Sequence, residues 1–206
     1  GLGDVYKRQG YNYGMFLTGW LVGKTGWAVS LKFRDFRLLR ISTVFYSLTT
    51  GMEHVAVGWL VLDLTGSPFL VGVAAAARMA PLFFLGILSG SIADWVDRRI
   101  LLGVSTIVGT VVSGGMASML LLGSAQVWAV ITLVAASGCV YAFVLTTRQA
   151  YTFDIVGPEH SLNGLSLGAM AMQVGGIVGA VGSGVLIQAL GTGLQYVAIG
   201  TAYGAA

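Results

Sequence analysis

Two charged residues lie inside long apolar stretches of the chain. Glu53 falls within residues 41–62 and Arg78 within residues 69–93. Glu53 lies nine residues before the end of its stretch at Leu62, and Arg78 lies nine residues after the start of its stretch at Phe69. Each separation is about 13 Å along a helix. An isolated charge at such a depth costs roughly 2.5–3.5 kcal/mol to insert into a membrane. We therefore expect the two side chains to pair, to face a central cavity and to serve substrate binding or proton coupling. A static ion pair is the alternative.

The elements that would position this pair are membrane-spanning helices. Of the 206 residues, 56% are hydrophobic and 9% are charged, whereas about 25% are charged in a soluble domain. Breaks between the apolar runs predict an all-α membrane protein with a helical bundle over residues 32–206. The expected spans are 41–62, 69–93, 100–122, 127–147, 163–190 and 194–206. The sixth is too short to cross a bilayer and is expected to be truncated, and a polar loop is expected at 148–162.

Basic residues predict the orientation of these spans. One set of connections carries Lys32, Arg34, Arg37, Arg40, Arg98, Arg99 and Arg148, whereas the connections at 63–68, 123–126 and 191–193 carry no Lys or Arg. Because cytoplasmic loops are enriched in Lys and Arg, the N-terminus is expected in the cytoplasm. The net charge of +3 is thereby assigned to membrane topology, and the lipid bilayer, not nucleic acid, is the expected partner. Residues 1–31 are expected to be translated adapter sequence and an uncertain segment.

The connection between the second and third spans carries the most specific motif, GSIADWVDRR at residues 90–99. Gly90 allows another helix to approach closely, and Asp97 is placed to cap the third helix. Arg98 and Arg99 would hold the loop in the cytoplasm and could pair with Asp94 or Asp97.

This motif resembles the loop 2–3 signature of the major facilitator superfamily. Within it, the motif is similar to the branch of transmembrane secretion effectors, which includes the enterobactin exporter and macrolide efflux proteins. Other segments that resemble this branch are FRLLR (36–40), GWLVLDLTGSPFLVG (58–72), AARMAP (76–81) and RQAYTFDIVGPEHSLNGLSL (148–167). The resemblance implies the N-terminal six-helix bundle of a major facilitator fold, with a second six-helix half as its partner.

Two sets of motif residues take roles from this resemblance. Gly90, Asp94, Asp97, Arg98 and Arg99 would form a cytoplasmic gate that bridges to the other half, although Trp95 stands where the family usually has a basic residue. Along the fifth span, small residues at close to four-residue spacing resemble the antiporter motif of helix five, with Ala180 in place of its proline. They are Gly175, Gly179, Ser183 and Gly184. Helix packing alone is the other interpretation of these residues.

The resulting prediction is a secondary active transporter of the inner membrane. A proton-coupled exporter of a small amphiphile, of drug or siderophore type, would work by alternating access. No cofactor or metal site is expected, because the chain has two histidines and a single cysteine, Cys139. A non-transporting receptor or assembly protein on the same fold is an alternative, and a membrane-embedded enzyme is a second one.

Overall fold

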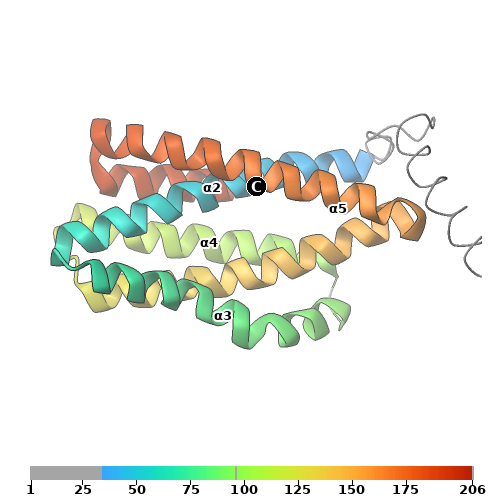
Figure 1. The fold of residues 1–206 in the computed structure, drawn as a ribbon, viewed down its shortest axis with the longest axis horizontal. Helices are drawn as coiled ribbons and strands as arrows, with labels where there is room; N and C mark the ends of the chain where they lie inside the picture. Colours follow the sequence, from blue (N-terminus) through green and yellow to red (C-terminus); the bar gives the residue numbers. More distant parts are fainter. Residues whose placement is uncertain (1–33, 96, 206) are drawn as a thin grey trace, which may run out of the picture.

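The computed structural model describes residues 34–95 and 97–205, with only the backbone of residues 34 and 86–95. This part of the chain is helical throughout, apart from short connections. The helices are α2 (Arg34–Thr65), α3 (Pro68–Trp95), α4 (Arg98–Leu121) and α5 (Val127–Gly204). They lie roughly along one common direction, as Figure 1 shows.

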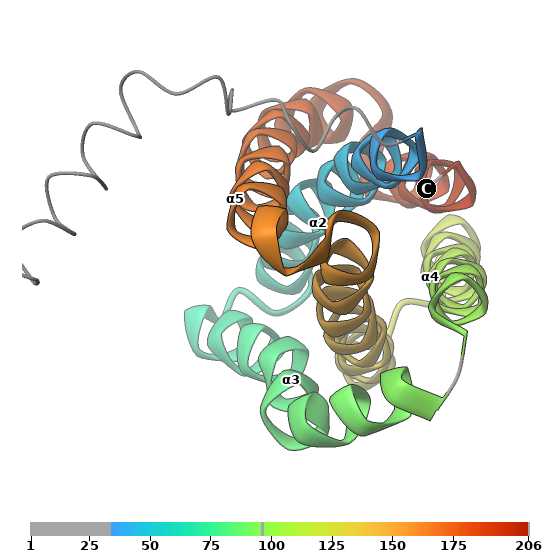
Figure 2. The same ribbon diagram turned by 90° about the vertical axis from the view of Figure 1, so that its right-hand side faces the viewer.

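Helix α5 is bent at two glycines. Gly157 has φ 71° and Gly191 has φ 77°, both in the left-handed region that glycine adopts without a steric penalty. The chain reverses its direction at each bend, so that α5 consists of three segments, 127–156, 158–190 and 192–204 (Figure 1). These three segments and the other helices form one bundle, seen end-on in Figure 2.

The expected number of six separate helices is not confirmed, because residues 34–95 and 97–205 contain four helices, the last of which is bent. The prediction of a polar loop at 148–162 is wrong, since this stretch is helical except at Gly157. Its polar side chains do not interrupt the backbone hydrogen bonds, and Pro158 follows the bend in the first turn of the next segment, where its missing N–H has no helical partner to lose.

Three of the described helices are long and apolar enough to cross a membrane: α3 over Pro68–Leu85, α4 and α5. Helix α2 does not reach the same hydropathy, because it contains more polar residues, and several of these are turned into the bundle. Glu53, Thr43, Ser47 and Thr49 of α2 are all buried. Large apolar side chains instead cover the outer faces, among them Phe83, Ile107, Val111, Ile177 and Val181. The bundle is therefore polar in part of its interior and apolar where lipid would surround it.

Candidate functional site

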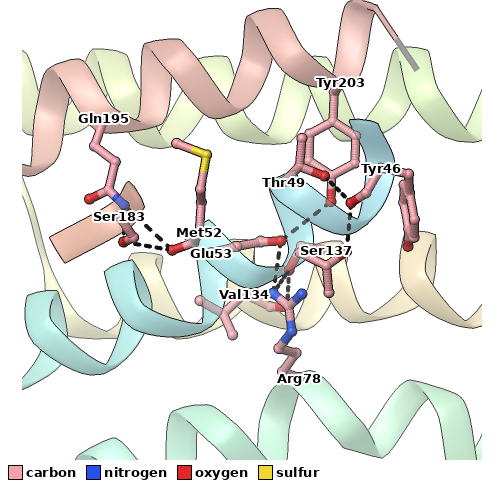
Figure 3. Close-up of polar contacts among 11 residues, drawn as sticks. Tyr46, Thr49, Met52, Glu53, Arg78, Val134, Ser137, Ser183, Gln195 and Tyr203 are labelled. Carbon is pink, nitrogen blue, oxygen red and sulfur yellow. Dashed lines mark hydrogen bonds and ion pairs between the residues drawn. The ribbon is translucent and has the colours of Figure 1, made fainter. Parts of the chain in front are cut away.

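Glu53 of α2 and Arg78 of α3 form an ion pair in the interior of the bundle. Arg78 Nη1 lies 2.8 Å from Glu53 Oε2, and the two side chains are 3% and 4% exposed. Figure 3 shows the two side chains meeting between their helices. The pairing expected from their equal depth is thus present. The two side chains do not face the central cavity that the sequence predicts, because both are enclosed by the helices of this bundle.

Neutral polar groups from α5 complete the surroundings of the pair. Ser137, in segment 127–156, accepts a hydrogen bond from Arg78 Nη1 at 3.3 Å and donates to the carbonyl of Val134 at 2.8 Å. Tyr203, in segment 192–204, donates its hydroxyl to Glu53 Oε2 at 3.3 Å (Figure 3). Each charged group therefore has a second partner, which is what a buried ion pair needs in order to offset its loss of water.

A glycine of α5 allows α3 to approach closely enough for these contacts. A Cβ added at Gly138 would collide with the backbone carbonyl of Arg78, so the two helices touch at the level of the ion pair. Ser137, next to Gly138, can then reach the guanidinium group. This contact is not predictable from the sequence, because Gly138 and Ser137 stand in an apolar run without a recognisable motif.

A second polar cluster lies one residue before Glu53. The main-chain oxygen of Met52 accepts hydrogen bonds from Ser183 Oγ at 3.1 Å and from Gln195 Nε2 at 3.4 Å. Gln195 also donates to Ser183. Two segments of α5 are thereby attached to α2 beside the ion pair, as Figure 3 shows.

The glycines expected along the fifth span do pack against α2. A Cβ added at Gly175 would collide with Ser47, and one at Gly179 would collide with the carbonyl of Leu48. Ser183 continues this contact through its hydrogen bond to Met52. Gly184 does not take part, because a Cβ at this position would meet open space. The spacing of four residues places the first three on one face, whereas Gly184 is turned away by about 100° from Ser183.

At the end of the bundle where α4 begins, arginines connect three helices. Asp97 is the N-cap of α4, accepting a hydrogen bond from the backbone N–H of Arg99 at 2.8 Å, as expected. Arg98 donates to the carbonyl of Ala150 at 2.7 Å and forms an ion pair with Asp154. Only the backbone is described at Gly90 and Asp94, so their expected part in the gate stays a prediction.

Arg99 makes contacts of its own at this end. Its Nη2 lies 2.7 Å from Asp35 Oδ2 of α2, and its Nε donates to the hydroxyl of Tyr151 at 2.6 Å. The sequence motif suggests only Asp94 and Asp97 as partners for the two arginines. Asp35 and Asp154 were missed because they are distant in the sequence, at separations of 64 and 56 residues.

Arg148 is a buried cation that the sequence analysis assigned only to a cytoplasmic loop. It is 5% exposed, and its guanidinium lies 5.0 Å from the centre of the Tyr46 ring. Its hydrogen bonds go to the hydroxyls of Thr43 and Ser42, both at 2.9 Å. It has no carboxylate partner among residues 35–85 and 97–205. The polar residues around it in the sequence predict a loop, so nothing in the pattern indicates burial.

Comparison with known proteins places the chain in a family. No curated protein matches the chain. A model of the family described as transmembrane secretion effector matches residues 24–205, which is nearly the whole chain. The long apolar helices and the match to this family together indicate a multi-pass membrane protein in a lipid bilayer. The chain therefore belongs to the transmembrane secretion effector family, a transporter family of the major facilitator type.

Proposed function

We propose that the protein is a proton-coupled exporter of a small amphiphile, working by alternating access in the inner membrane with its N-terminus in the cytoplasm. The observation that carries the proposal is the ion pair of Glu53 and Arg78, buried between α2 and α3. An ionisable residue inside a membrane-spanning bundle is a functional candidate by default, because its burial costs free energy that an apolar residue would not cost.

The chemistry of this pair suits proton coupling. A proton that binds Glu53 removes the negative charge and leaves the guanidinium of Arg78 without its counter-ion, 2.8 Å away. Among the described side chains, the other polar contact of that guanidinium is neutral, the hydroxyl of Ser137 at 3.3 Å. Protonation therefore changes which packing of α2 against α3 is most stable, and such a change can drive a transition between inward-facing and outward-facing states.

The other candidate sites have supporting roles in this proposal. The contacts of Arg98 and Arg99 with Asp154 and Asp35 hold the cytoplasmic end of the bundle together and would be remade when the gate opens. A second six-helix half would supply the other side of that gate and the rest of the substrate site. The close contact of α2 with segment 158–190, at Gly175 and Gly179, would stay together during this transition.

The substitution Glu53→Gln tests this function. Everted membrane vesicles that contain the protein would be supplied with a proton gradient and with labelled amphiphiles, including a macrolide and a catecholate siderophore. Gln keeps the shape of Glu but cannot carry a charge, so we expect proton-driven uptake to be lost. Asp63→Asn is the matched control, because Asp63 is an exposed acid near the end of the same helix. Uptake by Glu53→Gln with an unchanged rate and pH dependence would refute proton coupling at this site. Absence of uptake of any amphiphile would instead favour a receptor or assembly protein on the same fold.

A further inference from the structure

The last segment of α5, residues 192–204, contacts α2 at the very residue that the proposed function assigns to proton binding. Tyr203 donates to Glu53 Oε2, the same oxygen that Arg78 approaches. Gln195 of this segment donates to the main-chain oxygen of Met52, the residue before Glu53. Two side chains of one segment are therefore attached to consecutive residues of α2, as Figure 3 shows.

The ring of Tyr203 is held in place by two other helices. The side chain is 2% exposed. Its ring meets that of Tyr46 edge-on, with 5.9 Å between the ring centres and 68° between the planes. On the α4 side, a Cβ added at Gly109 would collide with the ring, so the absence of a side chain there leaves it room. The packing thus places the hydroxyl beside Glu53, with Thr49 as a second side chain within hydrogen-bonding reach.

Several ionisable groups surround Glu53, but few contact its carboxylate. Arg78 from α3, Tyr203 and Tyr196 from the last segment, and Tyr46 and His54 from α2 itself are within electrostatic reach. Among the side chains that the structure describes, Arg78 and Tyr203 make the contacts with the carboxylate oxygens. Tyr203 is therefore the neutral donor whose hydrogen bond depends directly on the charge of Glu53.

We propose that Tyr203 is a positioning residue that links the protonation of Glu53 to the placement of segment 192–204. This inference rests on the proposed function. In the charged state, the hydroxyl of Tyr203 stabilises the carboxylate and holds the segment against α2. A proton that arrives from water and binds Oε2 forms an O–H bond there, removes the negative charge and weakens the hydrogen bond from Tyr203. The segment is then released from α2 at this point.

The substitutions Tyr203→Phe and Tyr196→Phe provide a matched pair for the test. Both rings belong to the same segment and both are almost completely buried. Tyr203 donates to Glu53, whereas the hydroxyl of Tyr196 has no partner among the described residues. Each substitution removes one buried hydroxyl, but only the first removes a hydrogen bond to the carboxylate.

The measurement is an infrared titration of the purified full-length protein in detergent. The C=O stretch of the protonated carboxyl group is assigned to Glu53 by its absence in Glu53→Gln. We expect half-protonation to move to a pH about one unit higher in Tyr203→Phe, a tenfold change in proton affinity, because a hydrogen bond to a charged acceptor has been lost. Tyr196→Phe should leave the midpoint where it is in the unmodified protein.

Equal midpoints in Tyr203→Phe and the unmodified protein would overturn the proposal, as would the same shift in both phenylalanine variants or the absence of any band that depends on Glu53. If Tyr203→Phe does not fold, Gly109→Ala provides a second test, because its methyl group displaces the ring and should raise the midpoint in the same direction. A shifted midpoint together with unchanged proton-driven uptake by Glu53→Gln would refute the proposed function and leave the hydrogen-bond role of Tyr203 intact.

Discussion

Removal of the arginine from the buried pair should destabilise the protein strongly. In Arg78→Gln, the carboxylate of Glu53 stays buried, with Tyr203 as its remaining contact among the described side chains. At the observed N···O distance of 2.8 Å, the Coulomb attraction is about 6 kcal/mol for an effective dielectric constant of 20. Part of that attraction offsets desolvation, and buried pairs that lose one partner are destabilised by about 3–5 kcal/mol.

Equilibrium unfolding in mixed micelles would measure this loss. A destabilisation of about 3–5 kcal/mol corresponds to a change of roughly 10²- to 4 × 10³-fold in the unfolding equilibrium. The double variant Glu53→Gln with Arg78→Gln should recover much of the stability, because two neutral amides can hydrogen-bond to each other and no charge is left unpaired.

Two results would refute this reasoning. If Arg78→Gln unfolds at the same denaturant concentration as the unmodified protein, the charge of Glu53 is not buried in solution. If the double variant is less stable than Arg78→Gln alone, the unpaired carboxylate is not the cause of the loss.

Three further predictions concern packing, capping and topology. Gly179→Ala should lower stability by about 1–3 kcal/mol, because its methyl group meets the α2 backbone, whereas Gly184→Ala should be tolerated; unfolding of the two variants side by side decides this, and equal stabilities would contradict it. Asp97→Ala should lower the free energy of unfolding by about 0.5–2 kcal/mol, because the N-cap of α4 is lost. Asp97→Asn can still cap the helix and should keep most of this stability. An equal loss of stability in both variants would contradict the capping role. Single cysteines at Ser67 and Gln126, in a background that lacks Cys139, should react with an impermeant thiol reagent from outside intact cells; labelling only after lysis would reverse the proposed orientation.

The sequence was most informative where one local rule decides the outcome. Equal depth on consecutive helices predicted the contact of Glu53 with Arg78, and the preference of helix N-termini for aspartate predicted the cap at Asp97. Four-residue spacing of small residues predicted a close helix crossing at Gly175 and Gly179. The sequence did not identify α2 as the other helix of that crossing.

Contacts between distant segments were out of reach of this reasoning. Tyr203 and Glu53 are 150 residues apart, and neither their types nor their spacing indicates that they meet. The burial of Arg148 was missed because polarity was taken as a sign of a loop, although a polar face can be turned into a bundle. The central cavity expected around Glu53 is misplaced for a different reason, because depth in the membrane does not show how a helix is rotated about its axis.

The position of the two charges on neighbouring helices has a consequence for biogenesis. Glu53 and Arg78 are 25 residues apart (78 − 53) and lie on the two arms of the hairpin formed by α2 and α3. The two arms can therefore leave the translocon together with opposite charges already neutralised, which lowers the penalty that either helix would meet alone in lipid. Tyr203 lies 150 residues after Glu53 and is synthesised much later. Until then, Arg78 is the partner that can neutralise the carboxylate.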